Sequence, residues 1–179
     1  MNRSTVDKLV STLGLIVAVV LLLASFGLYF AHSFVHSQVS SQLSAQKITF
    51  PAANSVSLNA LPEADKKAVS QYAGQQLLTG AQAAVFADNY IAVHLNTIGG
   101  GKTYSELSEL AMTDPTNTAL AGKVNTVFKG ETLRGMLLNA YAFDTIGTIS
   151  LIASFVALAG GVILAVLSIF GFRHSKRAN

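Results

Sequence analysis

The sequence contains no cysteine among its 179 residues. This absence excludes disulfide bonds, thiolate metal sites and cysteine nucleophiles. Domains on the outer side of a cell membrane often use disulfides for stability. Any such domain in this chain must therefore be held together by packing alone.

Charge is also scarce. Charged residues make up 12% of the chain, about half the usual share, whereas hydrophobic residues make up 51%. The apolar excess is concentrated in two uncharged runs, residues 9–31 and 145–172. About 20 apolar residues span the hydrocarbon core of a bilayer as a helix, so both runs predict transmembrane helices. Neither run contains an acidic, basic or histidine side chain, which disfavours a proton or ion pathway through the membrane.

The first run is too long for a cleaved signal peptide. Its 23 uncharged residues exceed the roughly 7–15 residues of a signal-peptide core. No cleavage site of the small-x-small type follows it, because Phe30 stands two positions before His32. We therefore expect an uncleaved membrane anchor.

The charges that flank the two runs predict their orientation. Basic residues lie at both chain ends, and residues 32–144 carry seven Lys/Arg against eight Asp/Glu. Since short basic ends stay in the cytoplasm, we expect residues 1–8 and 173–179 inside the cell and residues 32–144 outside. The net charge of +3 comes mainly from the ends and favours an anionic lipid leaflet over nucleic acid as partner.

Helical patterns fill most of the middle segment. The first helix is expected to continue beyond residue 31, and an irregular or extended connection with Pro51 and Pro62 follows it. Further helices are expected over residues 62–78, 79–98 with Thr79 as N-cap, and about 104–112. A last helix of about 40 residues, roughly 60 Å long, includes the second run. The sequence therefore predicts an all-α membrane protein, in which two transmembrane helices extend into a mostly helical extracytoplasmic domain.

The stretch HLNTIGGGKTYS, residues 94–105, looks like the end of a phosphate-binding loop. That loop requires G-x-x-x-x-G-K-[ST] between a strand and a helix, but here Asn96 stands at the first glycine position and a helical pattern precedes it. A hinge explains every residue. Gly99–Gly101 supply a left-handed turn, Thr103 and Glu106 form a capping box for the next helix, and Lys102 has no phosphate to bind. We expect no nucleotide binding.

His32 and His36 are spaced one helical turn apart, and His94 is the other histidine of the middle segment. Two histidines at this spacing suit zinc, or non-haem iron when a carboxylate joins them, but the sequence selects no third ligand. We interpret the pair as a polar collar at the outer membrane surface and expect no metal or other cofactor.

Asp88 falls on the apolar stripe of the expected helix 79–98, which predicts a buried carboxylate with a basic or hydrogen-bonding partner. The candidate partners are Lys102 and Arg134; Arg134 and Glu131 lie off the apolar stripe of the last helix. A structural ion pair is the favoured interpretation. No serine or carboxylate pair has a catalytic context, so we expect no enzyme.

Small residues recur along both apolar runs. In the second run they are Ala153, Ala157, Gly161 and Ala165, and in the first run they are Gly14, Ala18, Gly27 and Ala31. In lipid, such residues let helices approach closely. They predict packing of the two spans on each other, on a second copy or on another membrane protein.

The segments QLSAQKITFP, GAQAAVFADNYIAVHL, GGGKTYSEL, DPTN and VFKGETLRGMLLNAYAF resemble a family of uncharacterised actinobacterial membrane proteins with two spans and an extracytoplasmic domain. The resemblance extends from about residue 38 to the second span. Related sequences sometimes bear an aromatic-ring-opening dioxygenase label, but this sequence contains no iron site of that kind. The resemblance implies a bacterial envelope location and no mechanism.

We therefore expect a membrane-anchored interaction or scaffold protein of the bacterial cell envelope. Its partners would be the bilayer and another envelope protein or a second copy. The alternative is an extracytoplasmic ligand-binding or sensory module that acts through a separate partner, because only seven residues follow the second span. An envelope enzyme or metal protein, or a subunit of a transporter or respiratory assembly, is less favoured.

Overall fold

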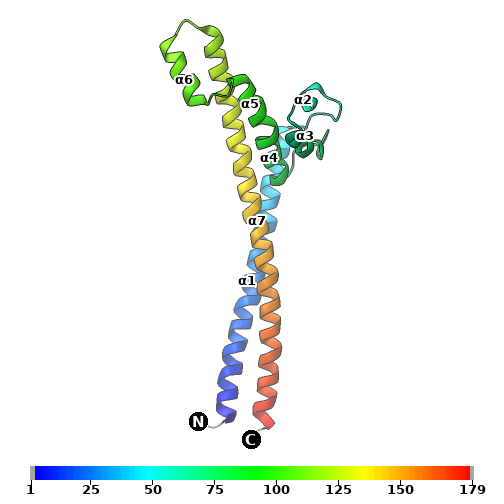
Figure 1. Ribbon diagram of the computed structural model, residues 1–179. Coiled ribbons are helices and arrows are strands. Elements are labelled where there is room, and N and C mark those ends of the chain that lie inside the picture. Colours follow the sequence, from blue (N-terminus) through cyan, green and yellow to red (C-terminus); the bar gives the residue numbers. More distant parts are fainter. Residues whose placement is uncertain (1–2, 178–179) are drawn as a thin grey trace. The chain divides into compact units, whose positions relative to one another are not determined.

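The computed structural model describes residues 3–177, and within them the chain is helical (Figure 1). The helices are α1 (Arg3–Gln46), α2 (Val56–Asn59), α3 (Glu63–Ser70), α4 (Gly80–Val85), the π-helix η1 (Phe86–Ile91), α5 (Ala92–Gly99), α6 (Tyr104–Thr113) and α7 (Thr118–Arg177). These residues contain no strand, only an isolated bridge between Thr49 and Gln76. The all-α prediction is confirmed.

The two longest helices, α1 with 44 residues and α7 with 60, are each long and apolar enough to cross a membrane. As predicted, α1 continues beyond residue 31. The expected length of about 40 residues for α7 is wrong. Helix α7 already begins after Asn117, whose side chain accepts a hydrogen bond from Leu120 N at 2.9 Å. No proline follows that start to interrupt the helix.

The chain divides into two compact units. The helix-pair unit contains the described residues up to Val35 and those from Ile146 onward. The helical unit comprises His36–Thr145. Helices α1 and α7 each contribute to both units, and α2 to α6 belong to the helical unit alone.

The core of the helical unit is built around Phe50. Its ring lies 5.2 Å from that of Tyr72 and 5.1 Å from that of Phe86, measured between centroids. Backbone pairing holds this segment in place, since Phe50 N donates to Gln75 O and Leu77 N to Ile48 O, both at 2.9 Å. The expected irregular connection after α1 is therefore ordered by pairing with the chain that follows α3. The expected helix 62–78 ends earlier, at Ser70.

The expected helix 79–98 is interrupted by the π-helix η1. A π-turn contains more residues than an α-turn, so it changes which side chains face the core. Phe86, Ala87 and Ile91 are buried, but the side chain of Asp88 is 51% exposed. The prediction that Asp88 is buried is therefore wrong. Its physical reason is the changed register, which an unbroken α-helical pattern does not reveal.

Candidate functional site

In the helix-pair unit, the most buried positions recur every seven residues. They are Ser4, Ser11, Ala18 and Ser25 on α1, and Gly147, Ser154, Gly161, Ser168 and Ser175 on α7. A period of seven is the repeat of a coiled coil, and small residues at each of these positions let the two backbones approach closely. The two segments therefore pack as a pair with a narrow, hydroxyl-rich seam.

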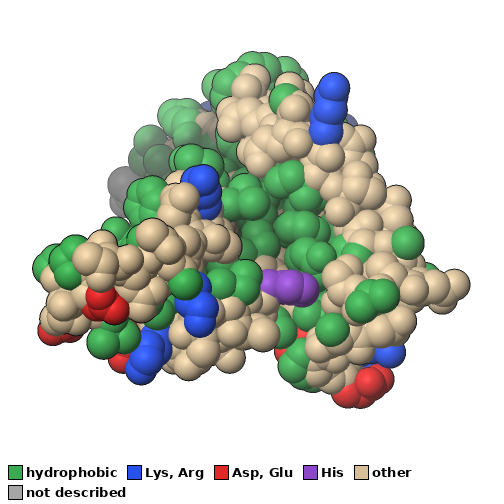
Figure 2. Space-filling view, turned by 90° about the horizontal axis from the view of Figure 1, so that it is seen from above, with side chains coloured by type: hydrophobic (Ala, Val, Ile, Leu, Met, Phe, Trp, Pro, Cys, Tyr) green, Lys and Arg blue, Asp and Glu red, His purple; other side chains and the backbone are tan. Residues whose placement is uncertain are grey.

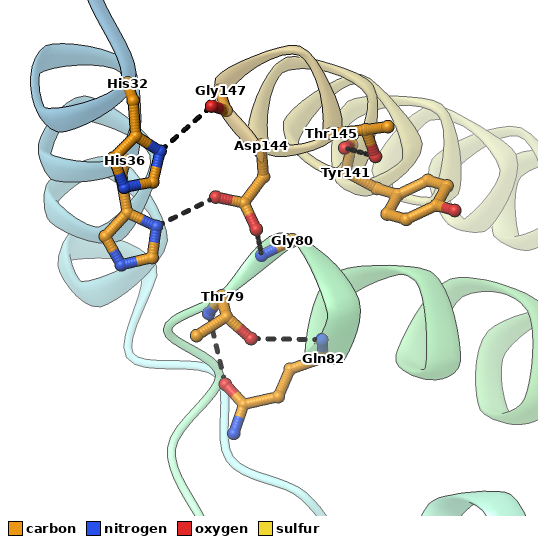
Figure 3. A network of polar contacts seen from close by, with 9 residues as sticks. All are labelled: His32, His36, Thr79, Gly80, Gln82, Tyr141, Asp144, Thr145 and Gly147. Carbon is orange, nitrogen blue, oxygen red and sulfur yellow. Dashed lines mark hydrogen bonds and ion pairs between the residues drawn. The ribbon is translucent and has the colours of Figure 1, made fainter. Parts of the chain in front are cut away.

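Hydrogen bonds across this seam show that the two segments run antiparallel. Ser4 Oγ donates to Ser175 O at 3.2 Å, and Ser154 Oγ donates to Ser25 O at 3.0 Å. The hydroxyls of Ser25 and Ser154 also lie 3.4 Å apart. His32 Nδ1 lies 2.9 Å from Gly147 O (Figure 3). Ser4, Ser25 and Ser154 thus find hydrogen-bond partners across the seam. The buried hydroxyl of Ser175 makes no hydrogen bond with the described residues.

Of the small residues predicted to pack, Ala18 and Gly161 lie in the seam, and half-buried Gly14 lies against it. Ala18 is fully buried, and a Cβ at Gly161 would lie 3.2 Å from Ala18 O. A Cβ at Gly14 would lie 2.6 Å from Ser168 Oγ. A Cβ at Gly27 would meet nothing within 4 Å among the described residues, so Gly27 makes no such close approach between the two helices. Packing of Gly27 on another chain stays a prediction.

The remaining predicted small residues lie beside the seam because its period is seven rather than four. Ala31, Ala153, Ala157 and Ala165 are half-buried. Ala153 and Ala157 line an apolar groove of about 660 Å³ together with Leu21, Ile149, Ile152, Val156 and Gly160. The groove is a second feature of the same helix pair, distinct from its buried seam.

In the helical unit, Asp144 joins three helices (Figure 3). Its Oδ1 lies 3.0 Å from His36 Nδ1 of α1, and its Oδ2 accepts a hydrogen bond from Gly80 N at the start of α4, at 3.1 Å. Helix α4 begins with the predicted N-cap Thr79, which forms a capping box with Gln82. A Cβ at Gly80 would overlap Asp144 Cβ. Glycine is therefore required where the carboxylate meets the helix end.

Asp144 is a contact residue that no motif in the sequence marks. Its signal was its position, since it is the last acidic residue before the second apolar run. This position places its carboxylate at the end of the segment 32–144, next to the second apolar run. Its contact with Gly80, however, joins residues 64 positions apart and follows only from the tertiary structure.

Asp88 pairs with Arg134, not with Lys102. Arg134 Nη2 lies 2.9 Å from Asp88 Oδ1, and Arg134 Nη1 lies 3.3 Å from Glu131 Oε2. The hydrogen bond to Asp88 raises the pKa of Arg134 above its ordinary value, against the effect of partial burial. Both side chains of the Asp88–Arg134 pair are partly exposed, at 51% and 32%. The pair connects η1 to α7 at the surface.

The predicted hinge between α5 and α6 is confirmed. Gly100 and Gly101 have φ angles of 63° and 78°, in the left-handed region that favours glycine. Thr103 and Glu106 form the capping box of α6, with Thr103 N donating to Glu106 Oε2 at 2.7 Å. That hydrogen bond lowers the pKa of Glu106, and the charge of exposed Lys102 acts in the same direction.

The structure does not gather the histidines into a metal-ligand set. Among residues 3–177, no group of three or more His, Asp or Glu side chains is arranged to hold a metal ion. His94 Nδ1 lies 2.8 Å from Tyr90 O, and its ring centroid lies 4.4 Å from that of Tyr90. His32 and His36 make the contacts described above with Gly147 and Asp144.

An apolar cluster is exposed where α6 meets the first part of α7. The rings of Tyr104 and Phe128 are in contact at 5.4 Å, and the two residues are 40% and 51% exposed. Met112, near the other end of α6, is also exposed, at 73%. Figure 2 shows hydrophobic side chains reaching the surface of the helical unit among separate acidic and basic ones. Aromatic residues and methionine are enriched in protein interfaces, so this cluster is a candidate contact surface.

No protein-family model, curated protein or solved structure matches this chain. The resemblance to an actinobacterial membrane-protein family, and the function inferred beside it, therefore remain predictions.

Proposed function

We propose that this chain is a membrane-anchored interaction or scaffold protein of the bacterial cell envelope, without catalytic activity. Residues 9–31 and 145–172 would cross the membrane, with both termini in the cytoplasm and residues 32–144 outside. Two helices of sufficient length and hydropathy support the anchor. The basic residues at both chain ends support the orientation.

The observation that carries the proposal is the exposed cluster formed by the rings of Tyr104 and Phe128. These residues lie outside both apolar runs, so the bilayer would not cover them in the proposed topology. Covering apolar surface stabilises a complex by about 25 cal/mol per Å² before the costs of association. The partner that fits is another membrane or envelope protein; a second copy of the chain is the alternative.

Reporter fusions test the topology. A reporter inserted at Ser57 should give an extracytoplasmic signal, and a reporter at the C-terminus should give a cytoplasmic signal. A cytoplasmic signal from position 57 would contradict the proposed arrangement, because residues 32–144 would then lie inside the cell.

Purification in a gentle detergent tests the interaction. We expect a stoichiometric companion protein, or a defined self-association, that is lost when Tyr104→Ser and Phe128→Ser are combined. Val56→Ser is the matched control, because Val56 is 86% exposed and lies in α2, outside the cluster. Loss of the companion in both variants, or in neither, would show that the cluster is not the contact. A wild-type chain that purifies alone as a monomer would overturn the proposed function.

A further inference from the structure

A cavity of about 290 Å³ lies between the start of α1 and the end of α7, within the helix-pair unit. Its lining is divided by polarity. Asp7, Ser11 and Ser168 supply polar side chains, whereas Val10, Leu164 and Leu167 supply apolar ones. A site with both characters suits a ligand that has a polar head and an apolar body.

The side chain of Asp7 is 28% exposed, but one of its two carboxylate oxygens is buried. Its Oδ2 atom is buried and accepts no hydrogen bond from the described residues. The imidazole of His174 lies beside it, with Nε2 4.0 Å from Asp7 Oδ2, beyond hydrogen-bond distance. A buried carboxylate oxygen without a hydrogen bond is costly, and such an atom commonly marks the place of a water, ion or ligand.

Two glycines in the lining keep the hydroxyls of this cavity close to the opposite helix. A Cβ at Gly14 would lie 2.6 Å from Ser168 Oγ, and a Cβ at Gly171 would overlap Ser11 Oγ. The hydroxyls of Ser168 and Ser11 therefore lie directly against the backbone of Gly14 and Gly171 on the opposite helix. The cavity thus offers a carboxylate and two hydroxyl groups within one small volume.

We propose that this cavity binds the primary ammonium headgroup of a phospholipid, as in phosphatidylethanolamine. An ammonium group has three N–H donors, which match the carboxylate of Asp7 and the hydroxyls of Ser11 and Ser168. The quaternary ammonium of phosphatidylcholine has no N–H and cannot make these hydrogen bonds. The apolar side chains of the lining face the glycerol and the first acyl carbons.

The place of the cavity in the chain selects a lipid rather than a soluble amine. Asp7 stands two residues before the run 9–31, and Gly171 stands one residue before the end of the run 145–172. In the proposed topology, which this inference assumes, both lie at the level of the inner headgroups. Lys8 and Arg173 belong to the same helix ends and are exposed, which suits the lipid phosphate.

The test uses the detergent-solubilised full chain and lipids with identical acyl chains. Native mass spectrometry would measure the retention of phosphatidylethanolamine, phosphatidylcholine and phosphatidylglycerol. We expect phosphatidylethanolamine to be retained about tenfold more strongly than phosphatidylcholine, the factor expected of one good charge-assisted hydrogen bond. Asp7→Asn should abolish this preference, Ser168→Ala should reduce it, and Glu109→Gln in exposed α6 should leave it unchanged.

Several outcomes would overturn the inference. Equal retention of the two lipids by the wild-type chain would exclude recognition of the ammonium. If Asp7→Asn still preferred phosphatidylethanolamine over phosphatidylcholine, Asp7 would contact only His174 and not the lipid. Stronger retention of phosphatidylglycerol would indicate that the basic chain ends recognise an anionic lipid. Retention of free ethanolamine as strong as that of phosphatidylethanolamine, in the same measurement, would indicate that the site binds a soluble amine and not a lipid. Because retention is measured in detergent, it depends neither on the orientation in the membrane nor on a protein partner, so the two proposals fail separately.

Discussion

At the scale of single residues, the helical unit depends on a few polar contacts between distant parts of the chain. Asp144 uses one oxygen for His36 and the other for the first amide of α4. A carboxylate at a helix N-terminus is stabilised by the exposed N–H groups and by the helix dipole. Asp144 thus attaches α4 to α7 directly, and Gly80 provides the space for it.

We expect Gly80→Ala to destabilise the start of α4 by about 1–3 kcal/mol, because the added methyl group would overlap Asp144. Native-state hydrogen exchange of the α4 amides would measure the change. Gly135→Ala is the matched control: Gly135 lies inside α7 with nothing within 4 Å of its Cβ position. There the helix propensity of alanine should give a neutral or slightly stabilising effect. Equal destabilisation by the two substitutions would contradict the steric argument.

Asp88→Ala should have a small effect, in contrast to the expectation for a buried carboxylate. The Asp88–Arg134 pair is partly exposed, so its loss should cost at most about 1 kcal/mol. Arg134 also keeps Glu131 as a neighbour. The protease-resistance profile of the helical unit should therefore remain almost unchanged. Rapid proteolysis of the variant would show that the pair contributes more than a surface ion pair.

At the scale of elements, the helix starts are encoded locally. The capping boxes of α4 and α6 each involve residues three positions apart, Thr79 with Gln82 and Thr103 with Glu106. Side chains so close in sequence meet whatever the rest of the chain does. The N-caps of both helices could therefore be predicted from the sequence, although Gln82 was not singled out.

The cap of α6 should respond to acid. The pKa of Glu106 is lowered from its ordinary value of 4.5, chiefly by the hydrogen bond from Thr103 N. Because the folded-state pKa lies below the unfolded one, this stabilisation is present above pH 4.5 and is lost as the pH falls through the folded-state pKa. An NMR titration should find Glu106 titrating below 4.5. In Thr103→Ala it should titrate closer to 4.5, because the variant loses the second hydrogen bond to this carboxylate, from Thr103 Oγ1 at 2.8 Å. Titration at or above 4.5 in the wild-type chain would contradict the capping role.

At the scale of the whole molecule, the seam of the helix-pair unit makes the two long helices partners over their apolar lengths. Small residues every seven positions set both the close approach and the antiparallel register. The absence of cysteine from the entire chain makes this register directly testable, since any introduced pair of cysteines is the sole pair.

Combined Ser25→Cys and Ser154→Cys substitutions should form a disulfide on mild oxidation. The two hydroxyls lie 3.4 Å apart, so the neighbouring Cβ atoms lie within reach of an S–S bond. The control pair, Phe26→Cys and Phe155→Cys, replaces the adjacent residues, which are 75% and 59% exposed on the outside of the helix pair. Mass spectrometry of proteolytic peptides should find the cross-link only in the first variant. Cross-linking in both variants, or in neither, would contradict the register.

The sequence by itself determined the helical class, the two long apolar helices, the glycine hinge and the caps of α4 and α6. Each of these depends on composition or on residues within one or two helical turns. Only the tertiary structure decided the exposure of Asp88, the choice of Arg134 as its partner, the contacts of Asp144 and the seven-residue seam. The physical reason is that these features depend on packing between segments distant in the sequence. The π-turn changes which residues face the core, and the packing of α1 on α7 determines which residues are buried every seven positions.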